Sequence, residues 1–286
     1  YIVMLLFWPH VHTNIFLEPF KNFIEQFGTH FGPDNILLNS KIYSTSDVPI
    51  FYIFINLLFK SPEYILFLYI IFLYLIFETK FRVNEYPNFN INIFLIFLIL
   101  ILPTIFIIFS SFKLYDGLRL FLYIIPFYCI IPALVIFYLI KNIKFFLNKF
   151  LLIFSTLLFI FFIFNFIKIT PYQYTYYNIF AGKKENLVNK FEIDYWGISL
   201  KELVSSIIKD DYETINGFTN IAVCGLNHDI IKIEFNKYQN FKYKIKDLIY
   251  EDYDYVIMNN RPVFKEDDKF ITCYEKFKSK SIIDIK

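Results

Sequence analysis

The sequence predicts a mainly α-helical membrane protein, a polytopic bundle of transmembrane helices followed by a small C-terminal α/β domain. Apolar residues make up 57% of its 286 residues, and the mean hydropathy is +0.47. Both values are too high for an ordinary water-soluble domain. Charge is concentrated after residue 168: residues 1–168 hold 11 Lys and Arg and 8 Asp and Glu, and residues 169–286 hold the other 17 and 18. We therefore expect a transmembrane region over 1–168 and a soluble α/β domain over 169–286.

Four apolar windows approach or reach the roughly 17–25 residues that a helix needs to cross the hydrocarbon core. These predicted spans cover about residues 62–77, 91–109, 120–140 and 150–167. Tyr1–Trp8 reads as the last turns of an earlier span, so we expect the chain to be a fragment. Ser61 is the expected N-cap of the first window, with Pro62 at its first helical position.

Residues 9–61 form a long outer segment before the first window. Within it, Pro49–Phe59 is an apolar run bounded by Asp47 and Lys60 and too short to span. We expect a helix lying in the membrane interface, with its aromatic side chains in the headgroup layer. Asn39–Asp47 is polar and lacks helical periodicity, and this predicts a loop facing the membrane.

Lys and Arg in the short loops predict the orientation, because such residues favour the cytoplasmic side. They follow the first and the third window: Lys80, Arg82, Lys141, Lys144 and Lys149. The opposite face then carries residues 9–61, the polar turn 113–119 and the C-terminal domain. In a bacterium these parts would lie on the periplasmic side of the inner (plasma) membrane.

The C-terminal domain shows patterns of both helix and strand. Ser199–Lys209 carries apolar residues at helical spacing, and Asn220–Cys224 and Tyr253–Met258 are short apolar runs that each end in a polar turn. Strands and a helix in this order predict a small α/β domain. Three cysteines imply no disulfide framework, and a bridge between Cys224 and Cys273 is compatible with the sequence without being required.

Three strings in this order resemble bacterial membrane glycosyltransferases of the GT-C type, in the family related to dolichyl-phosphate-mannose protein mannosyltransferases. The strings are Leu38–Pro49, Tyr115–Arg119 and Phe191–Ser199. The resemblance covers most of the chain and corresponds to the C-terminal half of such an enzyme. It implies transfer of a sugar from a polyprenyl-phosphate donor to a protein, lipid or glycan acceptor on the outer face of the bilayer.

The resemblance also implies a catalytic acidic residue in a first outer loop. That loop would precede Tyr1, so we expect this chain alone to be inactive. A second departure is Leu120, where the family's motif has a His after the Arg.

Arg119 and Asp116 are the first candidate site residues, because charge at the edge of a membrane span is costly and needs a reason. Arg119 could stabilise the phosphate charge that develops as the glycosidic bond breaks. Alternatively, it snorkels to headgroups or only neutralises Asp116. Asp116 could orient Arg119 or bind a sugar hydroxyl, or it could be a helix N-terminal acid favoured by the helix dipole.

Tyr43 and Asp47 are further candidates for lining the outer cavity, with Asp47 contacting acceptor or sugar. Alternatively, Ser46 or Asp47 caps the interfacial helix. Trp196 lies in the most distinctive string of the C-terminal domain, and we interpret it as a core or rim residue in preference to a sugar-stacking one.

Other chemistries lack a signal. His10, His12 and His30 have no supporting carboxylate spacing, so a divalent metal is not supported, and no cofactor is evident. No basic stripe suggests nucleic acid, and no phosphate-binding glycine loop, Cys-x-x-Cys or Gly-x-Ser-x-Gly motif occurs. The alternative function is a non-catalytic component of polysaccharide or lipid export, whose outer domain binds a glycan or a partner.

Overall fold

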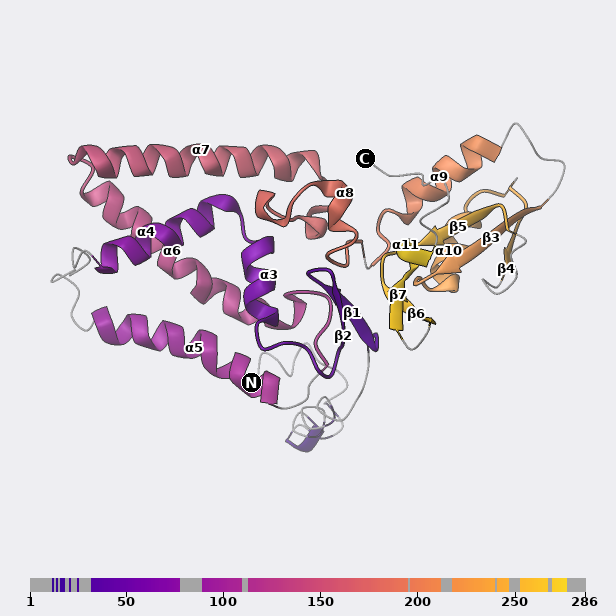
Figure 1. Cartoon of the computed structure of the whole chain (residues 1–286), viewed down its shortest axis with the longest axis horizontal. Helices are drawn as coiled ribbons and strands as arrows, with labels where there is room; N and C mark the ends of the chain where they lie inside the picture. The colour runs from indigo at the N-terminus through magenta and orange to yellow at the C-terminus, as the bar shows by residue number, and fades with distance from the viewer. Residues whose placement is uncertain are drawn as a thin grey trace.

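The computed structural model describes residues 32–77, 89–109, 113–194, 196–211, 218–239, 241–246, 253–266 and 269–276, with a few isolated residues between 12 and 25. The predictions for Tyr1–Trp8, His10, His30 and the basic loop with Lys80 and Arg82 fall outside these residues. The described chain is mainly helical and carries small sheets (Figure 1).

The described residues of the first part include four long helices: α4 (Glu63–Phe77), α5 (Phe89–Phe109), α6 (Ile125–Lys141) and α7 (Phe146–Lys168). The short 3-10 helix η2 (Arg119–Ile124) leads into α6. Among the described residues, two helical stretches are long and apolar enough to cross a membrane by themselves, Arg119–Lys141 and Phe146–Lys168, and the bent pair Tyr52–Lys60 and Glu63–Phe77 would pass the same test together. The first two stretches match the predicted spans 120–140 and 150–167, which are confirmed to that extent. The windows 62–77 and 91–109 are helical, and their crossing of the membrane stays a prediction.

The long helices bury one face and expose the other. Leu68 and Phe72 of α4 pack against Ile131 and Val135 of α6, and all four are nearly inaccessible. The outward faces remain apolar, and on α7 they include Phe150, Ile153, Leu157, Ile160 and Phe164. Apolar surface of this extent is consistent with contact to lipid.

The predicted interfacial run forms helix α3 (Tyr52–Lys60), which makes an angle of 113° with α4. Tyr52, Ile53 and Asn56 are buried, whereas Phe54 and Leu58 on the other face are more than 45% exposed. A short helix with one exposed apolar face, set across a neighbouring long helix, is suited to the membrane interface.

Two predictions of helix caps are wrong. The N-cap position of α3 is Phe51, with no side-chain hydrogen bond, so neither Ser46 nor Asp47 caps this helix. The hydroxyl of Ser61, the expected cap of α4, is bonded to that of Tyr128 in α6 instead.

A distant segment closes the α3–α4 bend. The Asn178 side chain donates hydrogen bonds to the carbonyls of Leu58 (2.6 Å) and Ser61 (2.8 Å). Glu63, at the start of α4, accepts hydrogen bonds from the Tyr176 hydroxyl (2.9 Å) and the Ile179 amide (3.0 Å). These contacts satisfy polar groups that the break in the helix would otherwise leave without partners.

The predicted loop at residues 39–47 is wrong in its first half, where a β-hairpin forms instead. Strands β1 (Asn35–Leu38) and β2 (Lys41–Ser44) pair antiparallel around Asn39 and Ser40. Both turn residues have positive φ, 49° and 67°. A two-residue turn with this backbone matches the twist of the paired strands, and Asn is well suited to it.

Residues 169–199 connect the long helices to the α/β unit. They contain three short helices, η3 (Gln173–Thr175), η4 (Ile179–Ala181) and α8 (Lys184–Leu187). Ala181, Leu187 and Phe191 pack into the same apolar cluster as the β1–β2 hairpin and α3. Much of this connection therefore packs on the membrane-side part of the molecule.

The α/β unit confirms the predicted helix and both predicted strands. Helix α9 (Leu200–Asp211) precedes a parallel sheet in the order β4-β3-β5, and a hairpin and a short helix follow. The remaining elements are β3 (Thr219–Cys224), α10 (His228–Phe235), β4 (Tyr243–Lys246), β5 (Tyr255–Met258), β6 (Pro262–Glu266), β7 (Lys269–Thr272) and α11 (Cys273–Lys276).

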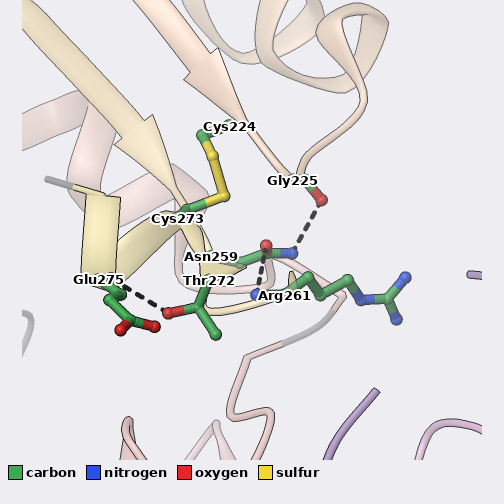
Figure 2. The surroundings of a disulfide bond; sticks show 7 residues. All are labelled: Cys224, Gly225, Asn259, Arg261, Thr272, Cys273 and Glu275. Atoms are coloured by element: carbon green, nitrogen blue, oxygen red, sulfur yellow. Dashed lines mark hydrogen bonds between the residues drawn. A yellow bond between two sulfur atoms is a disulfide. The ribbon is translucent and has the colours of Figure 1, made fainter. Parts of the chain in front are cut away.

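A disulfide joins Cys224 at the end of β3 to Cys273 after β7, with their Cα atoms 6.0 Å apart (Figure 2). Next to it, the Asn259 side chain donates to the Gly225 carbonyl (2.9 Å) and accepts from the Arg261 amide (3.2 Å). The turn after β5 is thereby held against the sheet.

The polar segments gather at one end of the long helices. Figure 1 shows the turn between α6 and α7 at one end, and α3, the hairpin and the α/β unit at the other. This arrangement agrees with the predicted grouping of the polar segments on one face. The membrane side that this face occupies stays a prediction.

Candidate functional site

Five charged residues from four separate segments meet where the α/β unit contacts the long helices. We name them the charged cluster: Lys60 at the end of α3, Asp116 and Arg119 of the 113–119 turn, Glu192 before α9, and Arg261 after β5. Three are bases and two are acids. Formally, the cluster carries one surplus positive charge when all five are ionised.

The hairpin and α3 hold the 113–119 turn in place. The Leu114 amide donates to the Thr45 carbonyl (2.9 Å), and the Tyr52 hydroxyl donates to the Gly117 carbonyl (3.1 Å). Asp116 and Gly117 both have positive φ, 56° and 65°. Residues other than glycine adopt a positive φ only at an energetic cost. The contacts of Asp116 must therefore stabilise its conformation.

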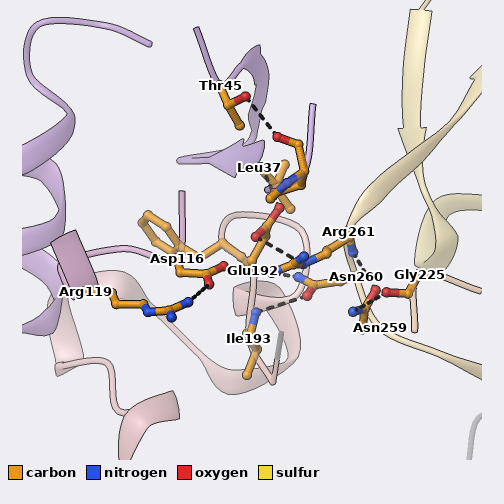
Figure 3. Close-up of polar contacts among 12 residues, drawn as sticks. Leu37, Thr45, Asp116, Arg119, Glu192, Ile193, Gly225, Asn259, Asn260 and Arg261 are labelled. Atoms are coloured by element: carbon orange, nitrogen blue, oxygen red, sulfur yellow. Dashed lines mark hydrogen bonds and ion pairs between the residues drawn. The ribbon is translucent and has the colours of Figure 1, made fainter. Parts of the chain in front are cut away.

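Asp116 lies between two guanidinium groups (Figure 3). Its Oδ1 is 2.7 Å from an Arg261 nitrogen, and its Oδ2 is 3.2 Å from an Arg119 nitrogen. The Asp116 side chain is only 4% exposed, whereas that of Arg119 is 48% exposed. Each carboxylate oxygen therefore accepts a hydrogen bond from a different arginine. One of these two arginines, Arg261, belongs to the α/β unit.

Glu192 and Lys60 form the buried side of the cluster. Burial raises the pKa of Glu192 to about 7, even though Arg261, the Leu37 amide and Lys60 favour its ionised form. Burial also lowers the pKa of Lys60 to about 8, with Asp116 and Glu192 opposing the change. Loss of hydration is the dominant cause in both cases. The two groups consequently titrate close to neutral pH.

A small cavity of about 20 Å³ lies among these residues. Lys60, Asp116 and Glu192 line it, together with backbone and side chains of β1 and α3. This volume admits about one water molecule. A sugar or phosphate group cannot fit inside, so a ligand of that size would contact the cluster from its exposed edge.

Arg119 and Trp196 form that exposed edge. The Arg119 guanidinium lies over the Trp196 ring, 4.7 Å from its centre, and Trp196 is 51% exposed. Asp194 holds the loop that carries Trp196, because its carboxylate accepts hydrogen bonds from the amides of Ile198 (2.9 Å) and Ser199 (3.0 Å) and from the Tyr174 hydroxyl. Trp196 is therefore not a core residue, since half of it is exposed beside a cation. The other interpretation, a residue of the membrane-facing rim, stays a prediction.

Two of the four predicted site residues come together and two lie elsewhere. Asp116 and Arg119 are paired, which is one of the alternatives open from sequence. The N-cap of η2 is Leu118, and no side chain makes a capping hydrogen bond there. The alternative that the helix dipole favours Asp116 stays a prediction. Tyr43 packs half-buried against the apolar cluster, and Asp47 is exposed after the hairpin. Neither lines the cavity.

Sequence reasoning missed three members of the cluster. Lys60 was considered only as the boundary of an apolar run. Glu192 is an isolated acid between Phe191 and Ile193, and Arg261 follows a buried strand. One sequence feature could have identified these residues: each is ionisable and lies within or directly after an apolar run. If such a residue is buried, its charge needs a partner, so it is a candidate member of a charged cluster.

Among the residues that the structure describes, no group of three or more His, Cys, Asp or Glu side chains could hold a metal ion. Comparison with family models, with curated proteins and with solved structures finds no match for this chain.

Proposed function

We propose that the chain is part of an integral-membrane glycosyltransferase that uses a polyprenyl-phosphate sugar donor and works at the outer face of a bacterial inner membrane. The observation that carries the proposal is Arg119. It lies half-exposed beside Trp196, at the end of an apolar stretch long enough to span the membrane, in a cluster with a surplus positive charge.

In this reaction the bond between the anomeric carbon and the phosphate oxygen breaks, and its electron pair stays on that oxygen. The acceptor's nucleophilic oxygen attacks the anomeric carbon from the opposite side and loses its proton to a base. We assign that base to no residue of this chain. Arg119 would stabilise the charge gained by the phosphate. Asp116 would hold Arg119, and the exposed Trp196 ring would offer a stacking face to the sugar.

Three further observations support the outer location. The Cys224–Cys273 disulfide is typical of an oxidising compartment. The two-sided helix α3 is suited to the interface next to the headgroups. The exposed lysines Lys141, Lys144 and Lys149 lie around the turn at the other end of the helices.

The test is a transfer assay with the full-length protein reconstituted in liposomes and supplied with a panel of polyprenyl-phosphate sugars. Arg119→Ala should abolish transfer, and Lys232→Gln, which removes an exposed charge on α10, should not alter it. Normal transfer by Arg119→Ala would exclude Arg119 from the site. Failure of every donor in the panel would reject the proposed reaction.

One observation favours the non-catalytic alternative, a glycan- or partner-binding component of an export system. The charged cluster largely neutralises itself around a cavity too small for a sugar. In that case the wild-type protein would bind a glycan in equilibrium dialysis and show no transfer from any donor.

A further inference from the structure

We propose that Arg261 is a positioning residue: by binding one oxygen of Asp116 it competes with Arg119 for that carboxylate, and so keeps Arg119 available to a phosphate ligand at Trp196. This inference rests on the proposed function in its choice of ligand. It assigns the α/β unit a direct part in the binding site on the membrane side.

Carboxylate geometry is the first step. An aspartate beside a single arginine commonly accepts two parallel hydrogen bonds, one on each oxygen. Arg119 lies three residues after Asp116 and would be free to adopt this fork. Here Oδ1 is already bound at 2.7 Å by Arg261, and Arg119 makes a single contact of 3.2 Å with Oδ2. Within the described part of the chain, that is the only hydrogen bond of the Arg119 side chain.

The charge balance is the second step. When all of its members are ionised, the group without Arg261 has no net charge, because Arg119 and Lys60 then balance Asp116 and Glu192. With Arg261 it carries one surplus positive charge, and Arg119, the more exposed of its two arginines, presents that charge to solvent. A surplus charge at an exposed guanidinium favours an anion with several acceptor oxygens, such as a phosphate monoester.

The rigidity of the Arg261 turn is the third step. The backbone at Arg261 is fixed, because its amide donates to the Asn259 side chain, which in turn donates to the Gly225 carbonyl next to the disulfide. The Asn260 side chain docks the same turn on the connecting segment by donating to the carbonyls of Val188 and Phe191 and accepting from the Ile193 amide. Figure 2 shows the contacts of Asn259 with Gly225 and Arg261, and Figure 3 shows Asn260 beside Ile193.

Trp196 provides a direct readout, since the chain has two tryptophans. In a background in which Trp8 and any tryptophan outside these 286 residues are replaced by Phe, Trp196 is the sole indole, and its emission reports both the position of Arg119 and the arrival of a ligand. The experiment titrates farnesyl phosphate, a short polyprenyl phosphate, into the protein in lipid nanodiscs. The variants are Arg261→Gln, Arg261→Lys, and Arg261→Gln combined with Asp116→Asn, with Lys232→Gln as the charge-matched control.

We expect Arg261→Gln to change Trp196 emission without ligand and to weaken farnesyl phosphate binding about tenfold. Arg261→Lys should keep most of the affinity. Asp116→Asn, added to Arg261→Gln, should restore both readouts, because Arg119 then has no carboxylate to pair with. If Arg261 has only a structural role, Asp116→Asn should restore neither readout. Absence of restoration in the double variant would overturn the inference. Unchanged emission and affinity in a folded Arg261→Gln variant would overturn it as well.

The two proposals can fail separately. If wild-type emission does not respond to farnesyl phosphate, the lipid-phosphate function is rejected. The ligand-free emission of Arg261→Gln and its reversal by Asp116→Asn still decide whether Arg261 positions Arg119.

Discussion

Glu192→Gln should stabilise the protein at neutral and alkaline pH and have no effect in acid. Burial raises the pKa of Glu192 from its usual 4.5 to about 7. The folded protein therefore holds this proton more tightly than the unfolded chain does. The stability that the protonated group contributes is fully present below pH 4.5 and is lost as the pH rises through 7.

The size of the effect follows from the two pKa values. Their difference corresponds to roughly 3 kcal/mol of folding free energy once the carboxyl is ionised. Gln removes this loss because it stays neutral at every pH, and its side-chain oxygen can still accept the Leu37 amide. For a chain of this size the melting temperature should rise by about 5 °C at pH 8.

The assay is thermal unfolding of both proteins in nanodiscs between pH 4 and pH 8. The two curves should coincide near pH 4 and separate steadily above pH 5. Asp34→Asn is the control of opposite sign, because a hydrogen bond and the charge of Lys113 lower the pKa of Asp34. The ionised Asp34 carboxylate stabilises the folded protein at neutral pH, and this stabilisation is lost on acidification. Asp34→Asn should therefore lower the melting temperature only at the upper end of the pH range. Parallel curves for Glu192→Gln, or a variant less stable at pH 8, would refute the reasoning.

Three further substitutions test the scaffold. Asn178→Ala removes both side-chain hydrogen bonds to the α3–α4 bend and should lower the free energy of unfolding by about 2–4 kcal/mol. The control is Asn142→Ala, which removes one hydrogen bond at the end of α6. A melting temperature of Asn178→Ala no lower than that of this control would contradict the prediction. Gly117→Ala should cost about 1–2 kcal/mol, because φ is +65° and the added carbon would lie 2.7 Å from the Lys60 ammonium; unchanged melting would contradict it. Replacing Cys224 and Cys273 by Ser should cost about 2–4 kcal/mol, and faster hydrogen exchange should be confined to the α/β unit.

The long helices were predictable because their signal is local. An apolar window identifies a membrane-capable helix without knowledge of its neighbours, and α6 and α7 follow the predicted windows closely. The same holds for α9, β3 and β5, whose apolar spacing reflects the face or core that each one buries. The hairpin at Asn39 and Ser40 was missed because its turn lacks glycine, which is the strongest hairpin signal.

The site was predictable only in part because its members are far apart in sequence. Asp116 and Arg119 lie three residues apart, and their pairing could be inferred from that spacing. Arg261 lies 145 residues from Asp116, and nothing local to either residue identifies the other. Glu192 and Lys60 have unusual pKa values through burial, which depends on packing that no local pattern specifies.

The α3–α4 bend also constrains the order in which the protein can be assembled. Tyr176 is synthesised 113 residues after Glu63, and Asn178 follows it. Helices α3 and α4 therefore leave the ribosome without the groups that satisfy their junction, and α7 must be made before those groups exist. We expect the junction to open and close repeatedly during synthesis and to become fixed only when residues 176–179 return to it. A nascent chain that ends at Lys168 would contain all four long helices and still lack the fixed angle between α3 and α4.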